Sequence, residues 1–401
     1  MKKTFLWWVV FFLAVCLSPQ GLAAPTDQAL ESVALQLKWF HQFQFAGYYA
    51  AIDQGYYAEE GLQVEIRERD PNKDFIAQVI SGQVDYGIGD SGIISHYANG
   101  HPIKALAAIF QHDALVLFSK QSSNIVSPYE MAGKRIMYDV TGENNAPIRA
   151  MLAEANLDES RYQKVAETFN NDDFVRGKVD VMAGYITDRP YSFRKLGLRF
   201  NIINPQNYGI DFYGDLLFTS RNELQNHPGR SERFLRASLK GWEYALAHPE
   251  AVIGLLQKQY HSRYSAGQLR YEAEETRKLI KPDTIPLGQI EPGRLRRVAD
   301  IYTNLKLAQP LSDGQLAEFV HGASKADTLK LSEAERQWLT AHPEIRVGVD
   351  SDFPPYGWLD ENGQYQGMVA ELLTMVGRHL DVKFVPVKAN SWQDILDKAK
   401  R

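Results

Sequence analysis

The sequence predicts an α/β protein of two lobes joined by a hinge, followed by the beginning of a second, similar module. From Val33 onward, short β-branched runs alternate with helical stretches, which is typical of a largely parallel sheet covered by helices. A unit of helix, glycine cap, short buried strand and closing glycine occurs at 75–89 and again at 174–184, and predicts two similar lobes. A new strand at Ile345, after a polar segment, predicts the second module.

The first lobe is expected to open with a strand that ends at 35–37 and a helix over 45–54. Gly55 and Gly61 each follow a helical turn, because glycine readily takes the left-handed conformation at a helix C-terminus. The next strand is expected at 62–67.

The second lobe is expected at about 120–215, inside a domain that covers 33–322. Near its start, Ser127 and Glu130 form a capping box, and Pro128 takes the first helical position. A glycine and a strand follow, as in the first lobe.

The C-terminal part of the chain is expected to be helical and then to start again as a new module. Residues 230–247 carry apolar side chains at helical spacing, and helices continue to about Gly322. Residues 323–344 are polar and predict a linker helix. Residues 345–401 are expected to be the N-terminal fragment of a second module, cut inside its last domain.

Residues 1–24 are expected to be a signal peptide, with two lysines, an apolar run over 5–17 and small residues before a cut after Ala23 or Ala24. The alternatives are a retained anchor and a lipidated Cys16. Removal of this segment would leave no cysteine, which excludes disulfides, thiolate metal sites, iron–sulfur clusters and cysteine nucleophiles. We expect no cofactor.

The charge is nearly balanced, with 44 Lys and Arg against 49 Asp and Glu, a net charge of −5. This balance argues against nucleic acid as a partner, and the 44% of hydrophobic residues argues against disorder. The histidines have no metal-binding spacing.

Residues 87–92 read Gly-Ile-Gly-Asp-Ser-Gly and match a dinucleotide-binding fingerprint, with Asp113 about twenty residues downstream. The same stretch contains a serine-protease motif. The favoured interpretation is that this glycine-rich strand end lines a cleft, because the fingerprint normally lies in the first strand–helix–strand unit.

Aromatic residues gather where the first strand ends, and ligands bind at such strand ends in open sheets. Trp39, His41 and Tyr48 are therefore candidate ligand contacts, since aromatic faces stack on flat rings. The alternative for each is core packing.

Polar candidates come from three further segments. Asp139, Thr141 and Gly142 lie between a strand and a helix, where the acids favour a neutral or amine-bearing ligand over an anion; the alternative is simple helix capping. Tyr213 and Asp215 precede the strand that crosses back to the first lobe, and the alternative there is a polar turn. The remaining candidates are Asp90, Ser91 and Tyr185.

The stretches LKWFHQFQFAGYYAA at 37–51 and GYYAEEGL at 55–62 resemble the solute-binding proteins for thiamine pyrimidine precursors and the related thiamine pyrimidine synthases. The resemblance covers 33–322. It implies a type II periplasmic binding fold in which two lobes close on a flat heterocycle, with Trp39 as the ring-stacking residue and Gly142 at the start of a phosphate loop. The second glycine of that loop is absent.

The resemblance also separates binding from synthesis. The synthases use an active-site lysine, a nearby histidine and a cysteine-rich iron motif, whereas 87–90 contains no lysine and 210–214 reads Ile-Asp-Phe-Tyr-Gly. We therefore expect a binding protein; a synthase-like enzyme is the disfavoured alternative.

Residues 345–401 resemble the start of amino-acid-type solute-binding modules, which also occur in periplasmic sensors. This implies a periplasmic protein, either free or tethered to the membrane in the full-length protein. Its expected partners are a small heterocycle and either an ABC permease or a fused membrane signalling domain, as in a histidine kinase or diguanylate cyclase.

Overall fold

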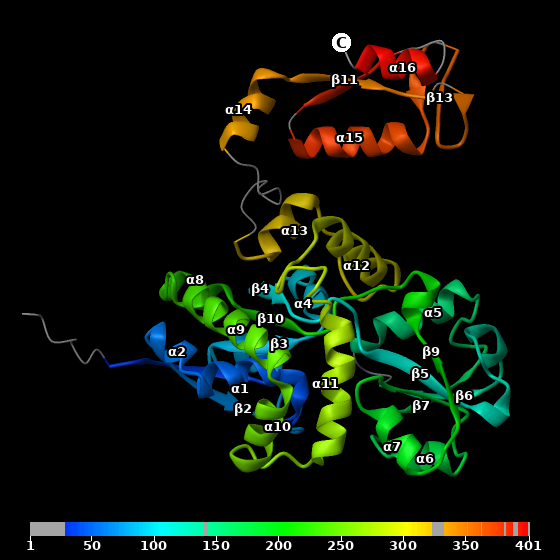
Figure 1. The fold of residues 1–401 in the computed structure, drawn as a ribbon. Coiled ribbons are helices and arrows are strands. Elements are labelled where there is room, and N and C mark those ends of the chain that lie inside the picture. The colour runs from blue at the N-terminus through cyan, green and yellow to red at the C-terminus, as the bar shows by residue number, and fades with distance from the viewer. Residues whose placement is uncertain are drawn as a thin grey trace, which may run out of the picture. The chain divides into compact units, whose positions relative to one another are not determined.

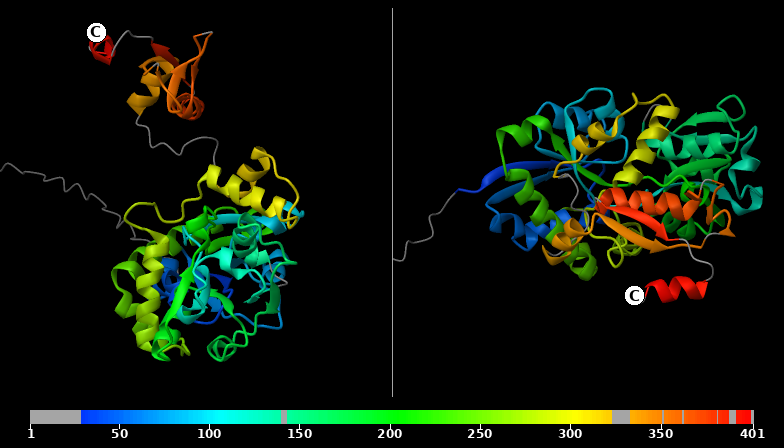
Figure 2. Two further views of the ribbon diagram at one scale, coloured as in Figure 1. Left: turned by 90° about the vertical axis from the view of Figure 1, so that its right-hand side faces the viewer. Right: turned by 90° about the horizontal axis from the view of Figure 1, so that it is seen from above.

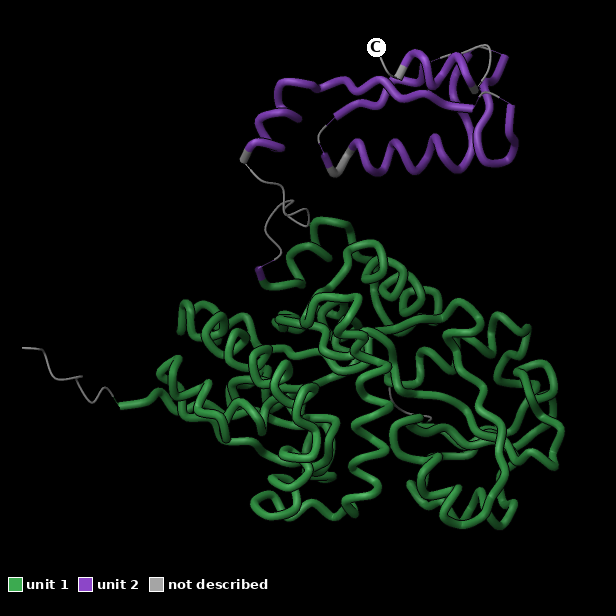
Figure 3. Tube along the Cα trace, viewed as in Figure 1, with its two compact units in different colours: residues 1–321 green, residues 322–401 purple. Residues whose placement is uncertain are grey.

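The computed structural model divides the chain into two compact units, residues 1–321 and 322–401 (Figure 3). We call them the first and the second unit. The predicted signal peptide lies outside the described residues. The structure describes residues 29–139, 143–322, 333–350, 352–361, 363–380, 382–387 and 392–399.

The first unit confirms the predicted α/β fold, with two five-stranded sheets that lie in separate lobes (Figure 1). The first sheet has the strand order β2-β1-β3-β10-β4, and β10 is antiparallel to both of its neighbours. Its strands are β1 (Glu31–Gln36), β2 (Leu62–Arg67), β3 (Tyr86–Gly89), β4 (Ile103–Ala108) and β10 (Leu216–Ser220).

The second sheet repeats this plan with the order β7-β6-β8-β5-β9, in which β5 is antiparallel to β8 and β9. The chain crosses to it after β4 and returns before β10 (Figure 2). The second lobe therefore spans 115–203, against the expected 120–215, because β5 belongs to the second sheet and 204–215 forms the return crossover. Its strands are β5 (Leu115–Lys120), β6 (Arg135–Tyr138), β7 (Gln163–Ala166), β8 (Val181–Tyr185) and β9 (Phe200–Ile203).

Helices cover both sheets, and several begin and end at the residues that the sequence indicates. The capping box of Ser127 and Glu130 is present, and Gly55 and Gly61 have φ angles of 76° and 74°. The first-lobe helices are η1 (Phe43–Phe45), α1 (Ala46–Asp53), α2 (Tyr56–Glu59), α3 (Phe75–Ile80), α4 (Ile93–Ala98) and α8 to α13 (Arg221–Asn226, Arg230–Ala247, Pro249–Lys258, Ala266–Ile280, Pro292–Asn304 and Asp313–Phe319). The second-lobe and crossover helices are η2 (Gln121–Ser123), η3 (Pro128–Met131), η4 (Glu143–Asn145), α5 (Ala146–Glu154), α6 (Asn171–Val175), α7 (Arg189–Lys195) and η5 (Pro205–Tyr208).

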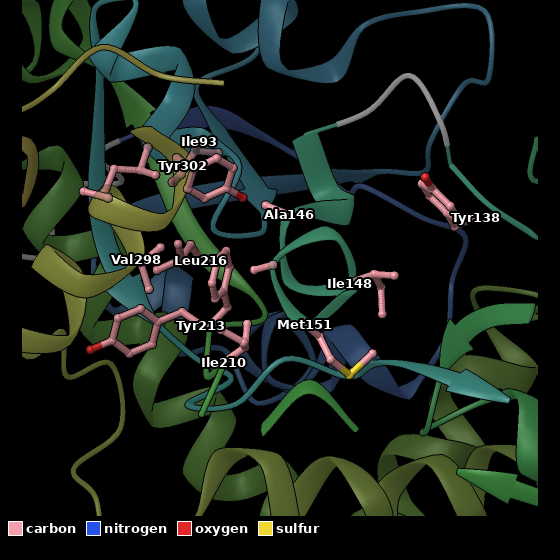
Figure 4. Packing of buried hydrophobic residues seen from close by; sticks show 14 of the residues in the cluster. Ile93, Tyr138, Ala146, Ile148, Met151, Ile210, Tyr213, Leu216, Val298 and Tyr302 are labelled. Carbon is pink, nitrogen blue, oxygen red and sulfur yellow. The ribbon is translucent and has the colours of Figure 1, made fainter. Parts of the chain in front are cut away.

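One hydrophobic cluster continues from the first lobe into the second (Figure 4). It joins Ile93 of α4 to Ile148 of α5, and it includes Tyr213 of the return crossover and Tyr302 of α12. The lobes therefore share apolar packing next to the crossovers.

The second unit combines short strands and helices. Its strands β11 (Glu344–Gly348) and β15 (Lys383–Val387) are parallel, as in the start of an α/β module. Within the range 323–344 predicted as a linker helix, the described residues form α14 (Glu333–Ala341). The other elements are β12 (Asp352–Phe353), β13 (Gly357–Leu359), β14 (Tyr365–Gln366), α15 (Met368–Leu380) and α16 (Trp392–Ala399). Within the described residues, no helix is long and apolar enough to cross a membrane.

Helices α1 and α9 approach each other closely because glycines face each other across the contact. A Cβ atom on Gly241 of α9 would lie 2.7 Å from Ala51 Cβ, and a Cβ atom on Gly47 of α1 would enter the Trp242 ring. Trp242 is fully buried at this contact. The helix that carries the aromatic motif is thus fixed by a contact with no spare volume.

We expect Gly241→Ala to lower the free energy of unfolding by about 1–3 kcal/mol, because the added methyl group overpacks the contact between α1 and α9. Gly254→Ala in α10 is the control, since its Cβ would meet no atom within 4 Å and helix propensity alone predicts a small gain. Urea unfolding of both variants measures the difference, and equal stability of the two would contradict this account.

Candidate functional site

A cavity of about 210 Å³ lies between the two lobes. Both lobes contribute to its lining, as does the first crossover, the segment 109–114 between β4 and β5. Such a lining is expected for a cleft that closes on a ligand. The lining residues are Lys38, Trp39, Gln42, Gln44, Arg69, Phe75, Asp90, Asp113, Leu115, Asp139, Asn144, Asn145, Glu167, Phe169, Ala183, Gly184, Tyr185, Asp188 and Arg189.

Two buried carboxylates hold the loop 38–44, which supplies one wall of the cavity. Glu272 of α11 accepts hydrogen bonds from the backbone N–H groups of Phe43 and Gln44, each at 3.0 Å. Asp215 accepts from Gln44 Nε2 at 2.8 Å. The Lys38 Nζ atom lies 2.8 Å from the same carboxylate. These contacts anchor the loop at both of its ends.

Trp39 lies in the cavity lining and is held by polar and aromatic contacts. Its indole N–H donates to the Tyr264 hydroxyl at 3.0 Å. Its ring centroid is 5.3 Å from that of Phe169, which belongs to the second lobe. The Arg69 guanidinium lies 5.1 Å from the Trp39 ring centroid. The predicted tryptophan is thus part of the cavity wall.

The inner part of the cavity contains a buried charged group of each sign. Burial lowers the pKa of Lys38, but Asp215, Tyr185 and Asp90 outweigh it and raise the pKa well above its ordinary value, so Lys38 stays protonated. Burial raises the pKa of Asp90, although Lys38 partly opposes the change. Both groups are shielded from water and interact strongly.

The lining carries more negative than positive groups. Three cations, Lys38, Arg69 and Arg189, face five acids, so the formal balance is 3 − 5 = −2. Lys38 is paired with Asp215, which is not itself a lining residue. An Arg189 nitrogen lies 3.9 Å from Glu167. The five acids are Asp90, Asp113, Asp139, Glu167 and Asp188. This arrangement suits a neutral or cationic ligand with hydrogen-bond donors.

Polar contacts join the two lobes around the cavity. His96 Nε2 of the first lobe lies 3.0 Å from Glu143 of the second. The Asn144 amide, with its nitrogen facing Asp90, donates to both carboxylate oxygens at 3.0 Å, and this orientation follows because a carboxylate only accepts. Gln268 of α11 donates to Asp188 at 2.7 Å. The structure therefore represents the two lobes in contact across the cleft.

Four of the predicted site residues reach the cavity: Trp39, Asp90, Asp139 and Tyr185. Thr141 and Gly142 lie outside the described residues.

The other five predicted residues lie outside the lining, which corrects their expected contact with ligand. His41 is hydrogen-bonded to the Tyr49 hydroxyl at 2.8 Å, and Tyr48 packs in the core against Trp242. The Ser91 hydroxyl donates to the Tyr213 carbonyl at 2.8 Å, and the Tyr213 hydroxyl accepts from Glu291 N–H. Asp215 is occupied by Lys38 and Gln44.

Several lining residues gave no recognisable sequence signal. Lys38 could have been inferred from its position beside Trp39. Arg69, by contrast, lies in a loop far along the chain from the loop that carries both Glu167 and Phe169. Asp113 was noted only as part of the dinucleotide fingerprint, whereas it lies in the first crossover. Gly87 and Gly89 of that fingerprint pack against Phe218, so their small size serves core packing. Among the described residues, no cluster of His, Cys, Asp and Glu is suited to hold a metal ion.

Comparison with known proteins relates both units to binding proteins. Residues 345–401 match the family described as bacterial extracellular solute-binding proteins, family 3. The chain is also 34% identical over 113 residues to the sensor protein EvgS of Escherichia coli K12, which covers 27% of this chain and 9% of EvgS.

Three curated proteins are similar to the first unit. The formylaminopyrimidine-binding protein of Halalkalibacterium halodurans is 26% identical over 251 residues, covering 62% of this chain and 75% of that protein. The riboflavin-binding protein RibY of Chloroflexus aurantiacus is 25% identical over 281 residues, with coverages of 68% and 78%. The 4-amino-5-hydroxymethyl-2-methylpyrimidine phosphate synthase of Legionella pneumophila is 26% identical over 235 residues, with coverages of 56% and 72%.

The fold is also that of solved periplasmic binding proteins. The aliphatic sulphonate-binding protein SsuA of Escherichia coli aligns with a TM-score of 0.57 at 15% identity, covering 75% of this chain and 96% of SsuA. This likeness confirms the predicted type II periplasmic binding fold. Residues 42–252, more than half of the chain, match the family described as NMT1/THI5 like, and the protein belongs to that family.

Proposed function

We propose that the first unit binds a small, flat, nitrogen-containing heterocycle of the aminopyrimidine class in the cavity between its lobes. The observation that carries the proposal is that Trp39 lines the same cavity as five acidic side chains. A flat ring can stack on the indole, while amino groups on the ring edge donate to carboxylates. The formylaminopyrimidine-binding relative supports the same ligand class.

The charge of the cavity argues against an anionic ligand. SsuA shares the fold, but a fold alone does not transfer a ligand. Two of the three lining cations, Lys38 and Arg189, already face Asp215 and Glu167, and the third, Arg69, lies against the Trp39 ring. Amino groups, by contrast, can donate hydrogen bonds to the buried carboxylates.

Asp113 gives the cavity a group that can donate or accept a hydrogen bond near neutral pH. Burial, reinforced by the charge of Asp90 and opposed by Lys38, raises its pKa from 3.8 to about 7. The Leu115 N–H donates to Asp113 Oδ1 at 3.0 Å. The carboxyl is therefore fixed in place at the junction of the lobes, where it can pair with a ring nitrogen or an amino group.

Closure follows from the position of the cavity between the lobes. A ligand that contacts both walls binds the closed form more tightly than the open form and shifts the equilibrium by that difference. Binding of this kind requires no chemical step.

We infer that the protein binds its ligand without converting it, although one relative is named as a synthase. The single cysteine is Cys16, so the 210–214 segment offers no thiolate for iron, and 87–90 offers no lysine. The residues present therefore do not fit pyridoxal phosphate or iron at the positions that the resemblance to the synthases indicates. Spectra of the purified protein test this inference, because bound pyridoxal phosphate or iron would contradict it.

A second candidate function is that of a sensory receptor domain in the periplasm, for which the similarity to EvgS and the second unit provide the support. In that case ligand occupancy of the first unit would be passed through α14 to a membrane signalling domain. The alternative partner is an ABC permease. Osmotic-shock fractionation of cells that express the full-length gene distinguishes them, because a receptor stays with the membrane and a free binding protein is released.

We expect Trp39→Ala to weaken binding of 4-amino-5-hydroxymethyl-2-methylpyrimidine at least tenfold, about 1.4 kcal/mol, because the stacking face is lost. Isothermal titration calorimetry measures the change. Trp338→Ala is the control, since this tryptophan is 51% exposed in the second unit. No binding of this pyrimidine or its formylamino analogue to the wild-type protein would overturn the ligand assignment.

We expect the phosphate ester of the same pyrimidine to bind at least tenfold more weakly than the free alcohol. Its added negative charge meets an acidic lining in which Lys38 already faces a carboxylate. Competition calorimetry gives the ratio of the two dissociation constants. Tighter binding of the ester would mean that residues 140–142 supply a phosphate site.

We expect Asp113→Asn to stabilise the ligand-free protein increasingly as pH rises from about 4 to about 7. In this range the folded wild type keeps the Asp113 proton, whereas the unfolded chain has lost it. The unfolding free energy of the wild type therefore falls as pH rises. Asparagine does not titrate, so the variant does not lose stability in this way. Urea unfolding at several pH values measures the difference. Asp70→Asn is the control, because Asp70 is exposed and its hydrogen bond from Asn72 N–H lowers its pKa. A difference between Asp113→Asn and wild type that does not vary with pH would contradict the raised pKa.

A further inference from the structure

We propose that Phe169 is a specificity-determining residue whose ring, carried by the second lobe, closes the mouth of the cavity against Trp39 and covers a flat ligand. The ligand class rests on the proposed function. The placement of the ring does not, because it follows from the contacts of Phe169 in the structure.

The two rings come from opposite sides of the cleft. Trp39 follows β1 of the first lobe, whereas Phe169 lies in the loop between β7 and α6 of the second. Their centroids are 5.3 Å apart and their planes are inclined by 43°, which is direct aromatic contact. Because the rings belong to different lobes, this contact exists only while the lobes are closed.

Arg69 binds both rings at once. Its guanidinium carbon lies 5.1 Å from the Trp39 centroid and 6.0 Å from the Phe169 centroid. Its backbone N–H donates to the Trp39 carbonyl at 3.1 Å, which ties the arginine to the first lobe. The cation therefore favours the closed position of Phe169 through its attraction to the face of an aromatic ring.

The backbone of Phe169 is strained, and packing in a core does not account for the strain. Its φ angle is +57°, a conformation that costs free energy for a bulky side chain. The side chain is 54% exposed, so burial in a core does not offset this unfavourable backbone free energy. Strained residues of this kind concentrate at functional sites, where the surrounding structure holds them.

The residues that hold this conformation belong to the cavity itself. The Phe169 N–H donates to Glu167 Oε1 at 2.7 Å, and Glu167 lines the cavity opposite Arg189. Thr168 donates to Asp173 at 2.8 Å, which fastens the loop to the start of α6. The loop is thus built to present an aromatic ring at the mouth, and a ligand that is not flat would prevent the ring from reaching Trp39.

Phe169→Gly is the direct test, because glycine removes the ring and accepts the positive φ angle. We expect the affinity for 4-amino-5-hydroxymethyl-2-methylpyrimidine to fall at least tenfold by calorimetry. Phe169→Tyr keeps a flat ring and is expected to retain affinity within about twofold. Lys306→Gly is the matched control, because Lys306 is exposed with a φ angle of +59° and receives the same relief of strain away from the cavity.

A second measurement needs no ligand. Acrylamide quenching of Trp39 fluorescence, obtained by subtracting the emission of the matching Trp39→Phe protein, is expected to increase in Phe169→Gly and to stay unchanged in Lys306→Gly. Urea unfolding establishes that each variant is folded.

The outcomes separate this inference from the proposed function. If the wild type binds the pyrimidine and Phe169→Gly binds it equally well, the role of Phe169 is overturned while the function stands. If the wild type binds no aminopyrimidine, the ligand class fails and the quenching result decides the placement of Phe169. Unchanged quenching of Trp39 in Phe169→Gly overturns the inference whatever the ligand is.

Discussion

The site depends on two buried carboxylates beneath the loop 38–44. Asp215 pairs with Lys38 at 2.8 Å, and Glu272 accepts the first N–H groups of the following helix. Burial raises the pKa of Glu272 well above its ordinary value, while the hydrogen bonds from Phe43 and Gln44 oppose the change. A buried ion pair is costly to break, because removal of one partner leaves an uncompensated charge. These contacts hold the loop in the arrangement that places Trp39 in the cavity wall.

Both anchors come from segments far from the loop in sequence. Asp215 ends the return crossover and Glu272 lies in α11, whose Tyr271 hydroxyl also donates to the Ile186 carbonyl of the second lobe at 2.9 Å. Neighbouring residues of α11 thus hold the loop 38–44 and contact the second lobe.

The fold by itself does not determine the ligand of this protein. The sulphonate-binding protein SsuA shares this architecture at 15% identity, and a shared two-lobed frame does not specify a ligand. Specificity comes from the residues that face the cleft. Here they are a half-buried indole, an opposing phenyl ring and an excess of acids, which suit a flat ring with donor groups on its edge.

The sequence by itself determined the α/β class, the repeated lobes, the helix caps and the position of Trp39, because these depend on local periodicity, glycine conformation and strand ends. It also indicated Asp90, Asp139 and Tyr185, which lie next to strand ends. Only the tertiary structure decided that Asp215 supports Lys38 below the lining, that Tyr48 and Tyr213 are core residues, and that Phe169 meets Trp39. The reason is physical: whether a side chain faces a cleft or a core depends on contacts between segments more than a hundred residues apart, and no local pattern records those contacts.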